Sequence, residues 1–159
     1  MRGDGGDSRK IALAALGRRA HTRRELEQKL SRKGFDRAEI RALLDDLEER
    51  GWLNDAKTAT ALAAWRSRTG RGRSRIASEL AGKGVARVDV DAALASLDPG
   101  DEAKALRAAL ERRERALPAG LTRQARSKKL FDHLARRGFA PAAILEALHR
   151  KGDFTDDEP

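Results

Sequence analysis

The chain repeats one short pattern of apolar residues and glycine three times, and no other feature of the sequence limits the possible folds as strongly. Each copy consists of an apolar residue, a leucine four positions later, a glycine after four more, an apolar residue directly after it, and then an Ile or Val and a Leu four apart. The copies are Leu26, Leu30, Gly34, Phe35, Ile40 and Leu44; Ile76, Leu80, Gly84, Val85, Val90 and Leu94; and Leu130, Leu134, Gly138, Phe139, Ile144 and Leu148. Unchanged spacing in successive copies indicates a repeat protein.

Each copy predicts two helices joined by a tight turn. Two apolar residues four positions apart lie on one face of a helix. A basic residue followed by glycine is a common helix end, because glycine adopts the left-handed conformation and the cation lies near the last carbonyl groups. In the first copy the second helix presents Ile40, Leu43, Leu44 and Leu47 with helical spacing. We therefore expect three helical hairpins, each with one apolar side.

Capping signals predict where the helices begin. Thr22 and Glu25 match a capping box, Asp36 and Thr122 are good N-caps, and Pro141 suits a first helical residue. A further helix precedes each hairpin, over about residues 9–19, 54–68 and 101–117. These signals predict nine helices in three groups of three.

In the middle group, we expect the first helix to pack through Ala61, Leu62 and Trp65. Trp52 and Trp65 are both expected in the interior, with stacking on nucleic-acid bases as the alternative. No alternating run typical of a strand occurs, and the chain has no Tyr.

The predicted fold class is therefore all-α, with three tandem three-helix repeats. We expect a disordered N-terminus at 1–8, repeats at 9–53, 54–98 and 99–151, and an acidic disordered tail at 152–159. The tail is expected to aid solubility, and weak competition with a polyanion for the basic surface is the alternative.

The charge of the chain suggests a polyanionic partner, or a protein that assembles on one. Lys and Arg number 34 against 25 Asp and Glu, which gives a formal net charge of +9. Guanidinium groups suit phosphates and carboxylates because their forked donors bind bidentately. The predicted contact residues are Arg66, Arg68, Arg71, Arg73 and Arg75, with weaker patches at Arg32, Lys33, Lys128, Lys129, Arg136 and Arg137. Solvation of helix faces and loops is the alternative reading of these charges.

Nothing in the sequence indicates catalysis, a cofactor, a metal ion or a small-molecule substrate. There is no Cys, and His21, His133 and His149 lack the spacing of metal ligands. The glycines at 70 and 72 do not form a phosphate-binding loop, because no strand precedes them and no Lys-Ser/Thr follows. The apolar run at 11–16 is too short for a signal sequence or a membrane span. We expect a soluble cytoplasmic monomer.

Several motifs, taken in order, resemble the RecX family of regulators of the RecA recombinase. They are His21-Thr22-x2-Glu25-Leu26-x3-Leu30-x2-Lys33-Gly34-Phe35; Leu47-x3-Gly51-Trp52-Leu53-Asn54-Asp55; Arg75-Ile76-x3-Leu80-x2-Lys83-Gly84-Val85; and Leu134-Ala135-Arg136-Arg137-Gly138-Phe139. The resemblance extends over about residues 9–150. The sequence departs from the family pattern at 55–59, where Asp-Ala-Lys-Thr-Ala lacks the usual aromatic residue.

The resemblance implies an elongated, curved array of three repeats that lies in the groove of the RecA filament on DNA. It implies inhibition of RecA recombinase, ATPase and co-protease activities, and so a role in DNA repair, recombination and the SOS response. DNA contact would be weak and indifferent to sequence. The alternatives are a direct DNA-binding protein of the helix-turn-helix type, which would discriminate between bases, and a helical scaffold whose charge is incidental.

Overall fold

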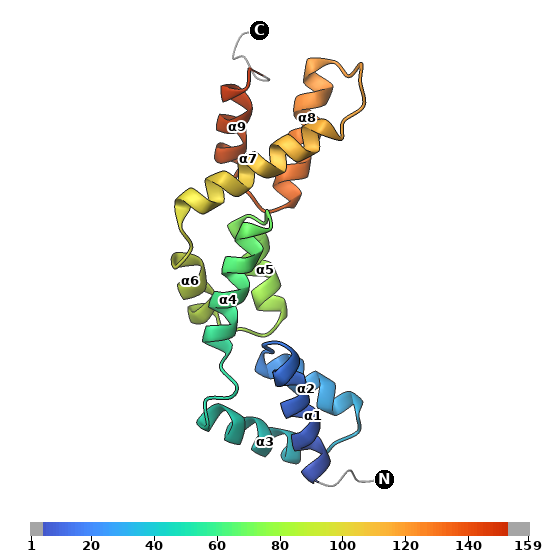
Figure 1. The fold of residues 1–159 in the computed structure, drawn as a ribbon, viewed down its shortest axis with the longest axis vertical. Helices are drawn as coiled ribbons and strands as arrows, with labels where there is room; N and C mark the ends of the chain where they lie inside the picture. Colours follow the sequence, from blue (N-terminus) through green and yellow to red (C-terminus); the bar gives the residue numbers. More distant parts are fainter. Residues whose placement is uncertain (1–4, 153–159) are drawn as a thin grey trace. The chain divides into compact units, whose positions relative to one another are not determined.

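The computed structural model describes residues 5–152, and this part of the chain is helical, with no strand (Figure 1). Its helices are α1 (Gly5–Arg18), α2 (Arg23–Arg32), α3 (Arg37–Glu49), α4 (Asp55–Arg68), α5 (Arg73–Gly82), α6 (Arg87–Ala95), α7 (Pro99–Arg115), α8 (Arg123–Arg136) and α9 (Pro141–Arg150). Grouped in threes along the chain, they confirm the predicted all-α fold of three three-helix repeats.

The start of the chain differs from the prediction of a disordered segment at 1–8. Helix α1 begins at Gly5, and Ser8 is only 1% exposed. An early helical turn is therefore part of the first repeat, although its composition of Gly and Asp gave no sign of it. Residues 1–4 and 153–159, and with them most of the predicted acidic tail, lie outside the described residues.

The repeated glycine ends the first helix of each hairpin, as the sequence pattern predicts. Gly34, Gly84 and Gly138 have φ angles of +86°, +80° and +86°. A side chain strains this left-handed conformation, so glycine is the favoured residue there. The apolar residue after each glycine donates its N–H to the carbonyl of the leucine four positions before the glycine, at 3.2–3.4 Å. The turn thereby folds back over the helix that it ends.

The predicted helix starts are also confirmed. Thr22 and Glu25 form a complete capping box at α2. Asp36 accepts hydrogen bonds from two backbone N–H groups at the start of α3, and Thr122 accepts one at α8. Pro141 is the first residue of α9. Local side-chain chemistry therefore sets these boundaries, as it does in other helical proteins.

The chain divides into two compact units, and the boundary between them passes through the middle repeat. The first unit comprises the chain up to Leu62 together with Glu79–Ala93, and the second comprises Ala63–Ser78 together with the chain from Leu94 onward. Helices α4, α5 and α6 therefore each contribute to both units. The predicted boundaries after residues 53 and 98 follow the sequence repeat and not these compact units.

Each unit has its own apolar core. In the first, α1, α2 and α3 pack against one another. In the second, α8 packs against both α7 and α9. The side chains in the two cores are Ala12, Ala15, Leu26, Leu30, Ile40, Leu43, Leu44, Leu47 and Leu53, and Ala105, Leu106, Ala109, Leu110, Leu130, Leu134, Phe139, Ile144 and Leu148. Most repeated apolar positions of the first and third copies are thus core positions, and Ile76, Leu80, Val85 and Val90 of the middle copy are buried as well.

The predicted interior positions of the two tryptophans are wrong. Trp52 is 52% exposed and Trp65 is 48% exposed. Helix α4 buries Ala59, Ala63 and Ser67, which follow one another every four residues. This stripe of small side chains replaces the expected face of Ala61, Leu62 and Trp65. A small side chain can bury completely where two backbones come close, and Trp65 consequently lies to one side.

Candidate anion-binding surface

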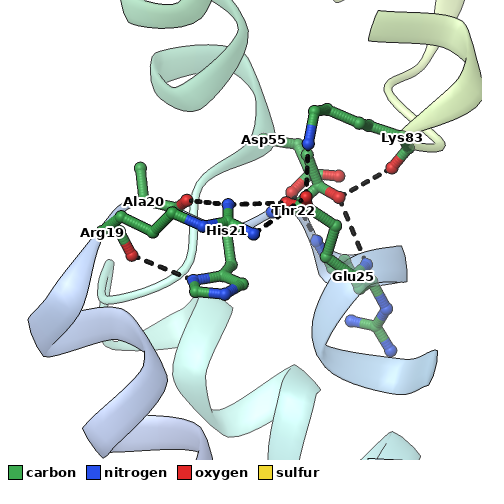
Figure 2. Close-up of polar contacts among 8 residues, drawn as sticks. Arg19, Ala20, His21, Thr22, Glu25, Asp55 and Lys83 are labelled. Atoms are coloured by element: carbon green, nitrogen blue, oxygen red, sulfur yellow. Dashed lines mark hydrogen bonds and ion pairs between the residues drawn. The ribbon is translucent and has the colours of Figure 1, made fainter. Parts of the chain in front are cut away.

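In the first unit, the turn between α5 and α6 lies against the start of α2 (Figure 2). The Thr22 hydroxyl donates to the Lys83 carbonyl oxygen at 2.7 Å, and the Lys83 ammonium pairs with the Glu25 carboxylate. One residue along, the Arg23 N–H donates to Asp55 Oδ1 at 2.8 Å. We call this set of contacts the first joint.

The charges of the first joint are balanced by Glu25. Burial favours a higher pKa for Glu25, but hydrogen bonds from Lys83, from the Thr22 N–H and from Arg19 outweigh it and lower the pKa to about 2. The carboxylate is therefore ionised at neutral pH and neutralises Lys83. Beside it, His21 Nδ1 lies 3.0 Å from the Arg19 carbonyl, and burial lowers the pKa of His21.

A corresponding second joint occurs in the second unit, where the start of α5 meets the turn between α8 and α9. The Gly72 N–H donates to the Arg137 carbonyl at 2.8 Å, and the Ser74 N–H donates to the Gly138 carbonyl at 3.3 Å. A Cβ atom on Gly72 would lie 2.2 Å from the Gly138 oxygen. The second joint therefore requires glycine at position 72, because the two backbones touch.

Arg73 belongs to the framework of the second joint. Its Nε donates to Glu102 Oε2 at 2.7 Å, and its terminal nitrogens donate to the carbonyls of Leu94 and Leu97 at 2.7 and 3.2 Å. In the repeat pattern Arg73 corresponds to Arg23, and the backbone N–H of each donates to a carboxylate in the first turn of the helix that opens the next repeat, Asp55 in α4 and Glu102 in α7. The Arg73 charge is therefore neutralised by Glu102 and does not add to the positive surface.

Arg137 and four arginines that lie near it or near His133 come from three segments at the second joint, where α7 packs against α8, and we call these five the arginine cluster: Arg71, Arg112, Arg113, Arg136 and Arg137. Arg137 occupies the position that Lys83 has in the first joint. It donates to the Gly70 carbonyl at 3.0 Å and, through Nε, to His133 Nε2 at 3.1 Å. Burial, followed by the charges of Arg71 and Arg112, lowers the pKa of Arg137.

His133 shares this positive environment. Burial, then the charges of Arg137, Arg113 and Arg136, lower the pKa of His133. Since an arginine Nε–H can only donate, His133 Nε2 must accept, and the imidazole is therefore neutral with its proton on Nδ1. His133 is therefore partly buried and surrounded by the positive charges of three arginines.

The arginine cluster lacks the carboxylate that neutralises the first joint. Within residues 5–152, none of its five guanidinium groups forms an ion pair with an acidic side chain. Arg113 Nε is also buried without a hydrogen-bond partner in this part of the chain. Closely spaced, uncompensated guanidinium groups can bind an anion through charge-assisted hydrogen bonds.

The structure distributes the eleven predicted contact residues over several places. Arg71, Arg136 and Arg137 lie in the arginine cluster. Arg66 lies over the ring of Trp65, with its Cζ 4.7 Å from the centroid, and Arg68 is exposed at the end of α4. Backbone and Cβ atoms of Arg75 lie against the turn glycine Gly138. The structure therefore brings only part of the predicted middle patch together.

The other predicted residues lie on exposed helix surfaces. Arg32 and Lys33 end α2 in the first unit, and Arg32 Nε donates to its own helix at the Gln28 carbonyl. Lys128 pairs with Asp132 at 3.6 Å, and Lys129 is exposed on the same helix. These residues add to the general positive charge.

Sequence reasoning missed Arg112 and Arg113, which end α7. The available signal was the run of basic residues in the last turn of that helix. Such a run usually complements the helix dipole, so the sequence alone gives it no further meaning. Within the described residues, no group of His, Asp or Glu side chains is arranged to hold a metal ion. No helix there has the length and apolar character needed to cross a membrane.

Two family models match this sequence. Residues 9–47 match the model described as RecX, first three-helix domain, and residues 54–94 match the RecX, second three-helix domain. These ranges coincide closely with α1–α3 and α4–α6.

Individual proteins with similar sequences carry the same name. The "Regulatory protein RecX" of Halorhodospira halophila is 40% identical over 153 residues, which cover 94% of this chain and 90% of that protein. The protein of that name from Stenotrophomonas maltophilia is 36% identical over 143 residues, covering 89% and 85%.

Two solved structures share the fold. One, described as the crystal structure of regulatory protein RecX, has a TM-score of 0.83 at 18% identity and covers 91% of this chain and 73% of the other. RecX from Lactobacillus salivarius has a TM-score of 0.76 at 19% identity and covers 94% and 97%.

Proposed function

Because the chain belongs to the RecX family, a family of regulatory proteins, we propose that it binds the RecA filament on DNA and inhibits RecA. The inhibition would extend to strand exchange, ATP hydrolysis and co-protease activity, and so to DNA repair and recombination. RecA works on DNA in the cytoplasm, and the protein would act there as a single chain without a cofactor.

The observation that carries this proposal is the combination of family membership with a positively charged surface. The described residues bury apolar side chains in two cores and leave arginines from several helices at the surface. A nucleoprotein filament offers phosphates and acidic protein faces at regular intervals. Many modest contacts to such a repeating partner add through effective concentration.

Inhibition requires no energy source in the inhibitor. A protein that binds one state of the filament more tightly than another shifts the population by the ratio of the two affinities. We propose that Arg68, Arg71, Arg136 and Arg137 make such contacts from the second unit, together with Lys128 and Lys129. Arg32 and Lys33 would make them from the first.

The proposal is tested by RecA-dependent ATP hydrolysis on single-stranded DNA, with the protein added at substoichiometric amounts. We expect a fall in the hydrolysis rate, and an unchanged rate would refute the proposed function. The double variant R71A/R136A should inhibit less. The matched control is R37A/R41A. It removes two exposed arginines of α3, and the variant should inhibit RecA as strongly as the unchanged protein does.

Binding to naked DNA separates this proposal from a direct DNA reader. A regulator of the filament should bind oligonucleotides weakly and without preference for sequence. A helix-turn-helix reader should instead discriminate between matched and mismatched sites by about 1–3 kcal/mol for each base pair.

A further inference from the structure

We propose that the arginine cluster, together with His133, binds the phosphodiester backbone of single-stranded DNA. The inference rests on the proposed function, since the DNA would be the strand inside the RecA filament. It goes further because it assigns one binding surface and one class of ligand to named residues of the second unit.

The two joints differ in charge. The corresponding basic residues, Lys83 and Arg137, both precede the glycine of a hairpin turn. Lys83 is neutralised by Glu25. The Arg137 guanidinium donates to a carbonyl oxygen and a neutral imidazole and pairs with no carboxylate among the described residues, and its neighbours Arg71 and Arg112 are positive. The second joint therefore keeps a net positive charge that the first joint removes.

This excess charge opposes folding, so a purely structural role does not account for it. Like charges held together repel, and the backbone hydrogen bonds of Gly72 and Ser74 already hold the second joint together without them. A bound anion would remove the repulsion. Arg113 Nε, buried without a partner in the part of the chain described, would also gain an acceptor.

The distribution of the arginines favours a nucleic-acid backbone over an acidic protein face. They come from the loop before α5, the end of α7 and the end of α8, so the charge is spread over neighbouring segments. A phosphodiester chain carries one negative charge for each nucleotide and no positive charge, and it can meet several of these groups in succession. Acidic protein surfaces usually carry basic side chains as well, and these would be repelled.

His133 links this surface to pH. The Arg137 Nε–H group donates a hydrogen bond to Nε2 of the neutral imidazole. A proton on Nε2 would break that bond and leave two donors, one from each residue, for a phosphate oxygen. The charges that face His133 are those of Arg137, Arg113 and Arg136, and on its own helix Asp132 is paired with Lys128.

The sign of the pH effect follows from this arrangement. Without a ligand, the pKa of His133 lies below its ordinary value of 6.5, because burial and the arginines disfavour the charged form. A bound phosphate favours the charged form and raises the pKa. Binding is therefore linked to proton uptake, and DNA affinity should rise as the pH falls below that ordinary value.

The test is the binding of a fluorescein-labelled oligothymidylate to the full chain without RecA, followed by fluorescence anisotropy at several salt concentrations. Loss of two phosphate contacts in R112A/R113A should lower the slope of log K against log salt by about 1.4 and weaken binding about 25-fold at about 0.1 M salt. The control R37A/R41A removes the same charge from α3 and should bind like the unchanged protein. Equal binding by the control and R112A/R113A would refute the inference.

Two single variants keep the test decisive if R112A/R113A folds poorly. Arg136 is exposed at the end of α8, and R136A should weaken binding about 5-fold at about 0.1 M salt through the loss of one contact. The H133Q variant should lose the gain in affinity between about pH 7.5 and pH 5.5, whereas H149Q, which alters a histidine of α9, should keep it. An identical pH response in H133Q and H149Q would contradict the role of His133.

The RecA assay separates this inference from the proposed function. If R112A/R113A binds DNA normally but no longer inhibits RecA, the arginine cluster contacts the recombinase, and the inference is wrong while the function stands. If the unchanged protein binds DNA as described but never affects RecA, the phosphate site stands and the proposed function fails.

Discussion

Replacing Glu25 by Gln should destabilise the protein in a way that depends on pH. The glutamine carbonyl can still accept the hydrogen bond from the Thr22 N–H, so the capping box keeps its shape. The change removes the negative charge that holds Lys83 and the more distant Arg19, and it places an amide NH2 donor where Oε1 accepted from them. The expected loss of stability is therefore the part of the first joint that depends on ionisation of the carboxylate.

Its size follows from the pKa of Glu25. The pKa falls from 4.5 to about 2 on folding, and the side chain is only 17% exposed. Each unit corresponds to 1.36 kcal/mol, so ionised Glu25 contributes about 3 kcal/mol at neutral pH. Because the pKa in the folded state is depressed, this contribution is complete well above pH 4.5 and is lost as the pH falls through about 2.

The measurement is urea unfolding followed by circular dichroism. We expect the free energies of unfolding of the unchanged protein and E25Q to differ by about 3 kcal/mol at about pH 7 and by about 1.5 kcal/mol at about pH 3. The matched control is E27Q, which alters an exposed carboxylate of the same helix and should cost less than about 0.5 kcal/mol. A difference for E25Q that is the same at both pH values would show that ionisation of Glu25 does not stabilise the first joint.

Three further substitutions test the joints and the helices. Gly72→Ala should lower the free energy of unfolding by at least about 2 kcal/mol, because its Cβ would lie 2.2 Å from the Gly138 oxygen; a neutral result in urea unfolding would contradict the close approach. Gly17→Ala should raise the free energy of unfolding by about 0.5–1 kcal/mol, since this helical glycine has nothing within 4 Å of an added Cβ. A lower midpoint temperature in thermal unfolding would show that the added methyl group does not fit. Thr22→Ala should cost about 1–2 kcal/mol, because it removes both the N-cap of α2 and the bond to the Lys83 carbonyl; Thr22→Ser, which keeps the hydroxyl, should restore most of the midpoint in urea.

The sequence predicts much of the fold because the repeated signals act over short distances. Leu26, Leu30 and Gly34 define a helix face and its end by spacing alone. The cap residues Thr22 and Asp36 act on N–H groups two or three positions ahead. Interactions between residues so close in sequence can be predicted from the sequence alone, and the structure confirms them.

The exposed tryptophans and the extra turn of α1 show where such reading fails. Whether Trp65 or Ala63 faces inward depends on how closely two backbones approach, and local spacing does not contain that distance. Likewise, the burial of Ser8 depends on the helices packed around it. Helix faces rich in alanine are the hardest to predict, since small side chains give little contrast in hydrophobicity.

The candidate site could be predicted only in part for the same reason. The sequence points to Arg71, Arg136 and Arg137 because they stand in dense basic stretches. It could not join them to Arg112 and Arg113, which belong to a distant helix. Nor could it show that Arg73 is engaged with Glu102, since that pair is formed by tertiary structure.

The main-chain construction of the second joint separates attachment from recognition. At the first joint, hydroxyl, carboxylate and ammonium groups fasten the helices, so any exchange of these side chains loosens the protein. Where Gly72 meets Gly138, backbone amides and carbonyls hold the segments together. Apart from Arg73, which bonds Glu102 and two carbonyls, the neighbouring side chains can therefore vary without that loss of stability. Substitutions of these side chains could therefore change the ligand that the second joint binds while its backbone contacts keep the fold unchanged.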